Sequence, residues 1–195
     1  MNLLFDIFSW LCGQNPARSF TIAGRLLPFC QRCTGLYLGL ALTFILLILS
    51  RAARKGLPPR RIIYLNILCM LLMPVFGFHL LDPGPAWRLW SGLIFGHALA
   101  CLLLPATFII ARWPRFENNS SKHLAGIYLL SFIVVNLIPW GFPIHSQIIY
   151  FLVLLLALLA LLGVAGCVTV VIYVWIKEVL NRFITKGYHY EGAKP

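Results

Sequence analysis

The chain has 195 residues, of which 61% are hydrophobic and only 11% are charged, and its formal net charge at pH 7 is +11. This composition excludes a soluble globular protein, because about a quarter of the residues in soluble domains are charged. We also expect no nucleic-acid partner, because the basic residues lie in short clusters between long apolar stretches and not on one polar face. The sequence therefore predicts a polytopic membrane protein.

The segment 2–11 is apolar but too short to cross a bilayer. We expect it to lie in the membrane interface or, alternatively, to form a re-entrant hairpin together with the residues up to Pro28. Asp6 stands where a secretory signal would carry positive charge, so we expect the segment to remain on the mature protein.

Five apolar stretches have the length of transmembrane helices, namely 34–50, 62–81, 89–111, 124–140 and 148–176. We therefore expect an all-α fold, a transmembrane bundle of about five spans that occupies residues 34–176. Residues 1–33 form an outer or interfacial segment that carries cysteines and arginines, and residues 177–195 form a basic cytoplasmic tail. The lipid bilayer is the first partner that this layout implies.

The basic residues predict the orientation of the bundle. Twelve of the 16 lie in the loops after the first and third spans and in the tail. Four lie on the opposite side, namely Arg18, Arg25, Arg32 and Arg88. The positive-inside rule then puts the C-terminus in the cytoplasm and the N-terminus outside.

Three of the six cysteines lie in the outer segment or at its end. Cys30 and Cys33 have C-x-x-C spacing, which lets both sulfurs face one point if the backbone turns into the first span between them. Cys12 lies in the same segment, and both Arg32 and the N-terminal dipole of the first span would lower the pKa of nearby thiols. Such thiols could bind zinc or another metal, form a structural disulfide or pack inertly, or exchange electrons with a quinone or a protein disulfide.

Three histidines are candidates for an additional ligand, of which His145 is expected in the outer loop between the last two spans and the other two lie at or in the spans. His79 is expected near the outer end of the second span, and His97 inside the third. His97 is the stronger candidate, because titratable groups inside a membrane are costly and tend to be functional. It could equally be an axial ligand of haem or of a chlorophyll-type pigment. The alternative for His79 and His97 is a hydrogen-bonded position in helix packing.

Arg18 and Arg32 could hold a lipid phosphate or another anionic head group in an outer pocket. The planar guanidinium group binds phosphate or carboxylate through two parallel hydrogen bonds. The alternative is that both arginines donate hydrogen bonds to loop carbonyls and close the outer end of the bundle.

Glycines repeat every fourth residue in the first and third spans, namely Gly35, Gly39, Gly92 and Gly96. Small residues at this spacing let helices approach closely, so we expect them to pack the bundle, or the third-span pair to dock another protein. This pattern, the small size and the presence of only five acidic residues favour an alternative function. The chain would then be a non-catalytic accessory subunit that docks with other membrane-protein subunits.

The run from Cys12 to Gly39 resembles an uncharacterised domain-of-unknown-function family of small prokaryotic membrane proteins with several helices. The family pattern is Cys-His-Gln, then Pro-x-Arg-Ser-Phe, a glycine, and Cys-x-Arg-Cys-Thr-Gly-x-Tyr-x-Gly. The chain matches this pattern at Cys12, Gln14, Pro16, Arg18, Ser19, Phe20, Gly24, Cys30, Arg32, Cys33, Thr34, Gly35, Tyr37 and Gly39. It departs from it at Gly13, where the family usually has histidine, and so lacks one potential metal ligand beside Cys12.

The resemblance implies a multi-pass protein of the prokaryotic inner membrane and no particular reaction. The residues themselves add a hypothesis, an outer cysteine and arginine site for metal binding or thiol redox chemistry. An accessory subunit and the handling of an anionic lipid are the alternatives. The sequence has no phosphate-binding loop, nucleophile elbow or His-Glu-x-x-His helix, and it assigns no enzyme class.

Overall fold

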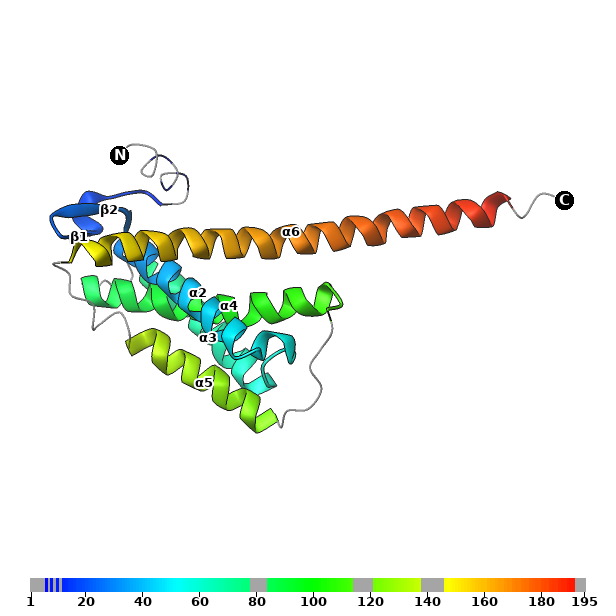
Figure 1. Cartoon of the computed structure of the whole chain (residues 1–195), viewed down its shortest axis with the longest axis horizontal. Coiled ribbons are helices and arrows are strands. Elements are labelled where there is room, and N and C mark those ends of the chain that lie inside the picture. The colour runs from blue at the N-terminus through cyan, green and yellow to red at the C-terminus, as the bar shows by residue number, and fades with distance from the viewer. Residues whose placement is uncertain are drawn as a thin grey trace.

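The computed structural model describes residues 6, 8, 10, 12–77, 84–113, 121–137 and 146–191. Apart from one two-stranded hairpin, the described chain is a bundle of helices (Figure 1). The elements follow the order η1 (Pro16–Arg18), β1 (Ser19–Ile22), β2 (Arg25–Cys30), α2 (Gln31–Leu49), η2 (Ala52–Arg54), α3 (Arg60–Gly77), α4 (Pro85–Ile110), α5 (Ser121–Leu137) and α6 (Gln147–Glu191). The expected all-α fold class is confirmed.

Three helices in the described residues are long and apolar enough to cross a membrane, namely Gln31–Leu49, Pro85–Ile110 and the part Gln147–Asn181 of α6. The segment Leu124–Leu137 of α5 is apolar but shorter. The two remaining spans of the expected five correspond to α3 and α5, and each of these helices borders residues outside the described part. The five helices thus follow the five apolar stretches, with ends shifted by a few residues except at the C-terminal end of α6.

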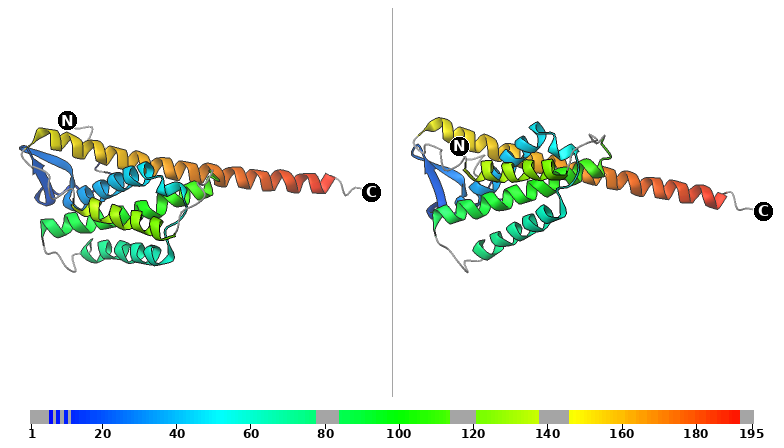
Figure 2. Two further views of the ribbon diagram at one scale, coloured as in Figure 1. Left: turned by 60° about the horizontal axis from the view of Figure 1, so that its bottom comes forward. Right: turned by 90° about the horizontal axis from the view of Figure 1, so that it is seen from below.

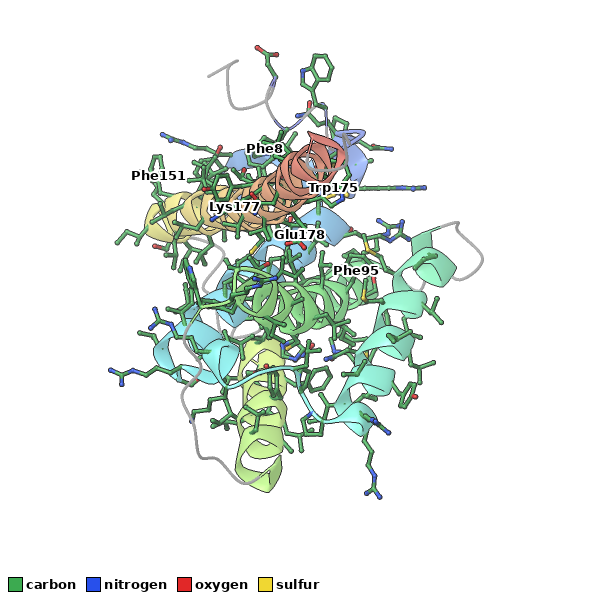
Figure 3. The ribbon with its side chains drawn as sticks, turned by 90° about the vertical axis from the view of Figure 1, so that its right-hand side faces the viewer. Phe8, Phe95, Phe151, Trp175, Lys177 and Glu178 are labelled. Atoms are coloured by element: carbon green, nitrogen blue, oxygen red, sulfur yellow. The ribbon has the colours of Figure 1, made fainter. Side chains whose placement is uncertain are left out.

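The helix α4 lies at the centre of the bundle and contacts α2, α3, α5 and α6. A view along the bundle shows α6 on one side of α4 and α5 on the opposite side (Figure 3). The most extensive of all helix contacts joins α4 to α2. These two helices therefore form the frame on which the rest of the bundle packs.

Glycine makes the close approach of α2 and α4 possible. Each of the four glycines singled out above faces a backbone carbonyl of the other helix, at a distance that leaves no space for a side chain. A Cβ atom would overlap the carbonyl oxygen of Leu89 at Gly35, of Leu93 at Gly39, of Arg32 at Gly92 and of Leu36 at Gly96. The two glycine pairs are thus reciprocal, as in small-residue helix contacts within membranes.

The two ends of the bundle differ in the elements that they carry. The hairpin and the first turns of α2, α4 and α6 gather at one end, whereas η2 and the last turn of α4 lie toward the other (Figures 1 and 2). The four basic residues expected outside belong to the elements of the hairpin end, and Arg51, Arg54 and Arg112 belong to the opposite end. Which end faces the cytoplasm stays a prediction.

The last helix continues beyond the expected fifth span. That span ends at residue 176, but α6 continues to Glu191 and takes in most of the expected tail. No proline interrupts residues 147–191, so nothing removes a backbone donor where the apolar stretch ends. Its 45 residues correspond to roughly 68 Å at 1.5 Å per residue, about twice the hydrocarbon thickness of a bilayer. The C-terminal part of α6 accordingly extends past the other helices (Figure 1).

Candidate metal centre

A β-hairpin that the apolar pattern did not indicate leads into α2. Ile22 of β1 pairs with Arg25 of β2, so the turn consists of Ala23 and Gly24. Both turn residues have positive φ, 51° and 73°, as the twist of a two-residue hairpin requires. The hairpin lies beside the first turns of α6 (Figure 2), where the Arg25 guanidinium is 5.9 Å from the ring centroid of Tyr150.

The hairpin delivers Cys30 to the start of α2. Ser19 pairs with Cys30 at the open end of the hairpin, and Cys30 is also the N-cap residue of α2. Cys33 follows in the first turn of that helix. Both residues of the C-x-x-C pair therefore lie at one helix N-terminus.

An aromatic cluster brings Cys12 to the same place. Phe8 is fully buried, with its ring centroid 4.8 Å from that of Phe29 and 5.6 Å from that of Tyr37. The backbone N–H of Cys12 donates to the carbonyl of Phe8 over 2.9 Å, so the position of Phe8 fixes that of Cys12. Gln14 follows, and its side-chain amide donates to the carbonyl of Pro28 over 3.0 Å. The N-terminal segment is thus attached to β2 on both sides of Cys12.

The structure brings together the three cysteines that the sequence singled out. The Sγ atoms of Cys12, Cys30 and Cys33 lie within 4.8 Å of one another. Cys12 is buried and the other two are half-buried, and all three are free thiols. The backbone N–H of Cys30 donates to the Cys12 Sγ over 3.3 Å, an arrangement that stabilises sulfur as a thiolate.

Hydrogen bonds lower the pKa of the Cys12 thiol well below its usual value. The side chain of Cys30 makes the largest contribution and that of Cys33 the next, and the backbone N–H groups of Cys30 and Gln14 act in the same direction. Burial opposes this shift without cancelling it. This direction favours the thiolate form of Cys12, which is the form of cysteine that binds metal ions and attacks disulfides.

A cavity of about 150 Å³ opens beside Cys12 and Cys30, and we refer to it as the arginine cavity. Its wall is formed by polar residues and two of the three cysteines, namely Cys12, Gly13, Gln14, Asn15, Arg18, Cys30, Gln31, Arg32 and Arg88. The wall holds three guanidinium groups and, among the residues that the structure describes, no carboxylate. Arg18 and Arg32, the two arginines predicted as site residues, therefore line the same cavity as Cys12 and Cys30.

Two residues of the cavity wall, Gln31 and Arg88, were not predicted as site residues. The Nη1 atom of Arg88 donates to the Oε1 atom of Gln31 over 3.1 Å. Gln31 is only 5% exposed, so its side chain holds Arg88 in a defined position. The one sequence feature that could have indicated Arg88 as a site residue was its expected location on the outer side, together with Arg18 and Arg32. Its approach to Gln31 depends on the α2–α4 contact, which the sequence alone does not define.

The structure places His97 away from the three thiols. Its Nδ1 atom is 3.0 Å from the Thr43 Oγ1 atom, and its Nε2 atom is 3.3 Å from the Cys101 Sγ atom. Thr43 lies ten residues after Cys33 on the same helix, about 15 Å along its axis. Both ring nitrogens of His97 thus have neighbours inside the bundle, as in a hydrogen-bonded packing position. His79 and His145 lie outside the described residues.

Comparison with known families gives a match over the region that contains the three cysteines. The model of a family described as "Predicted membrane protein (DUF2085)" matches residues 12–102. The resemblance is confirmed. A relative described as "Uncharacterized protein", from Methanothermobacter thermautotrophicus, is 46% identical over 39 residues, which are 20% of this chain and 34% of the relative. The chain thus covers about a third of the length of that relative. No solved structure matches the chain.

The matched region 12–102 contains the whole candidate centre. It includes the three cysteines, the arginines of the cavity and the four glycines of the α2–α4 contact. It ends inside α4, so α5 and α6 lie beyond it. The family description and the apolar helices together indicate a membrane protein.

Proposed function

We propose that the protein binds one zinc ion through Cys12, Cys30 and Cys33 at the non-cytoplasmic surface of the membrane. The observation that carries the proposal is the convergence of the three Sγ atoms within 4.8 Å of one another. Zinc–sulfur bonds of about 2.3 Å put the sulfurs of one site about 4 Å apart. Small side-chain rotations would therefore suffice to bring the three sulfurs to the distances of a zinc site.

The donor set favours a soft metal ion. Thiolates select zinc, cuprous copper and iron–sulfur clusters over hard ions such as magnesium and calcium. Zinc sites with three protein ligands leave a fourth position for water or a substrate, in contrast to closed structural sites with four ligands. Because Cys12 and Cys30 also line the arginine cavity, the fourth position would open toward that cavity. This arrangement supports a site that exchanges a ligand.

The charge distribution supports the placement of the three thiols on the non-cytoplasmic side of the membrane. The elements of the hairpin end carry four of the 16 basic residues, and the other twelve lie after the first, third and fifth apolar stretches of the sequence. Basic residues are retained on the cytoplasmic side during insertion. The three thiols would then face the compartment outside the inner membrane.

Thiol–disulfide exchange is the second candidate function. It is favoured by the C-x-x-C spacing of Cys30 and Cys33, which is also found in redox proteins, at the N-terminus of α2. Cys12 would then act as the resolving thiol. Zinc binding accounts better for three sulfurs in one place, because it uses all three thiols at once, whereas a Cys30–Cys33 disulfide leaves the third thiol, that of Cys12, outside the bond.

A role as an accessory subunit ranks third. The observation in its favour is that only 33% of the most apolar window of α6 is buried within the chain, compared with 56% for α2 and for α4. Membrane lipid is sufficient to cover this surface, so a partner subunit is not required to explain it.

Metal analysis of the purified protein tests the zinc proposal. The reduced protein is exchanged into uncharged detergent, incubated with equimolar zinc and then desalted. Elemental mass spectrometry should then find one zinc ion per chain. The triple variant Cys12→Ala/Cys30→Ala/Cys33→Ala should retain none. The double variant Cys69→Ala/Cys167→Ala is the matched control and should retain one, because both thiols lie elsewhere in the bundle.

Retention of zinc by the triple variant, or its absence from the wild type, would contradict the proposal. In the latter case a reversible disulfide among these three cysteines, detected by mass shift after alkylation, would favour thiol exchange instead.

A further inference from the structure

We infer that the arginine cavity binds an oxyanion, a phosphate- or carboxylate-type group, through Arg18, Arg32 and Arg88. The position of this anion next to a zinc ion rests on the proposed function. The binding of the anion to the arginines is independent of the proposed function, because the cavity and its guanidinium groups are present whether or not a metal is bound.

The charges around the cavity favour an anion. Three thiolates around a divalent zinc ion leave one negative charge, whereas the three guanidinium groups on the cavity wall carry three positive charges. No carboxylate among the described residues lines the cavity. Among the described residues that line the cavity, the charges thus sum to a positive value even when every cysteine is ionised and a zinc ion is bound.

The size of the cavity limits the ligand to a small group. Its volume of about 150 Å³ is several times the roughly 30 Å³ that one water molecule occupies in the liquid. It is also well below the roughly 300–1,000 Å³ of pockets that enclose drug-sized molecules. A phosphate or carboxylate group fits this volume, whereas a whole nucleotide does not.

The guanidinium group of Arg88 and the backbone that carries Arg18 are held in place before any ligand arrives. Gln31 is buried and accepts a hydrogen bond from Arg88, so this guanidinium is oriented by α2 although it belongs to α4. Arg18 ends the short helix η1, whose first turn is capped by a hydrogen bond from the Ala17 N–H to the Asn15 side chain. Guanidinium groups fixed on separate elements can surround one oxyanion with little loss of side-chain entropy.

The cavity also adjoins the sulfur atoms, because Cys12 and Cys30 form part of its wall. An oxygen of the bound anion could therefore reach the fourth position of a zinc ion held by the thiolates. The cavity lies at the hairpin end of the bundle, at the first turns of α2 and α4. Both free phosphate and the phosphate of a lipid head group have the required chemistry.

Titration calorimetry with inorganic phosphate tests the inference. Reduced, metal-free protein in neutral detergent should bind one phosphate per chain, with an affinity that falls as the salt concentration rises. Arg18→Gln and Arg88→Gln should each weaken binding by about tenfold or more, because each removes a charge-assisted hydrogen bond. Arg25→Gln is the matched control and should bind as the wild type does, since Arg25 is exposed on the hairpin and does not line the cavity.

A second titration distinguishes the two sources of phosphate. Mixed micelles that contain phosphatidic acid are compared with micelles that contain phosphatidylcholine alone. If phosphatidic acid displaces inorganic phosphate from the wild type and not from Arg88→Gln, the ligand is a lipid head group. If it does not displace phosphate, the ligand is a free anion. Both results support the oxyanion site.

The inference is overturned if neither probe binds the metal-free wild type, or if Arg18→Gln and Arg88→Gln bind phosphate as Arg25→Gln does. Circular dichroism and size-exclusion profiles show whether the variants are folded. Because the phosphate titration uses metal-free protein, its result can be interpreted even if the protein does not bind zinc. Conversely, normal zinc content together with absent phosphate binding would overturn this inference alone.

Discussion

Replacing Gly92 with alanine should lower the thermal unfolding midpoint of the protein in detergent and disturb the thiol site at the same time. The new Cβ atom would overlap the backbone carbonyl oxygen of Arg32, which cannot rotate away. The helices α2 and α4 must then separate along their most extensive contact. Overpacking typically costs about 1–3 kcal/mol, or about 2–4 °C of midpoint for each kcal/mol in a chain of this size.

The matched control for this substitution is Gly126→Ala on α5. Gly126 has no atom within 4 Å of the place where its Cβ would lie, so alanine there adds helix propensity without a clash. Tryptophan fluorescence follows unfolding in both variants, because Trp87 and Trp90 lie on α4. Equal midpoints for Gly92→Ala and Gly126→Ala would show that the α2–α4 contact tolerates a side chain and would contradict this account of the fold.

Replacing Cys12 with alanine should weaken zinc binding by more than about 100-fold. Substitution of residues that merely orient a zinc ligand already costs about 10–100-fold in affinity, and Cys12 is proposed as a ligand itself. Its lowered pKa adds to the effect, because the thiolate binds zinc without first releasing a proton. Competition with a fluorescent chelator measures the affinity, and Cys167→Ala on α6 is the control.

A Cys12→Ala affinity within threefold of the wild type would show that Cys30 and Cys33 bind the metal without it. The candidate centre would then reduce to an ordinary C-x-x-C pair, and the aromatic cluster around Phe8 would have only a structural role.

The helices were predictable because a membrane span requires a long apolar stretch, which can be recognised directly in the sequence. Uninterrupted apolar runs of bilayer length correspond to α2, α4 and α6, and the glycines at four-residue spacing lie where α2 meets α4. The hairpin was not predictable from the same signal. Its strands are four and six residues long, and Pro28 lies within the second, where proline normally argues against a strand.

The residues of the candidate centre could be predicted from the sequence, but their arrangement in space could not. The C-x-x-C spacing alone predicts that Cys30 and Cys33 are close. The approach of Cys12 depends on the packing of Phe8 against Phe29 and Tyr37, which is a tertiary contact without a local signature. The same holds for Arg88, which meets Gln31 across 57 residues of sequence.

The most direct test of the central claim is X-ray absorption spectroscopy at the zinc edge on the loaded, reduced wild-type protein. The account predicts three sulfur scatterers at about 2.3 Å and one lighter ligand, oxygen or nitrogen, in the fourth position. A first shell with two or fewer sulfurs, or one that is unchanged in Cys12→Ala, would contradict a centre built from these three cysteines.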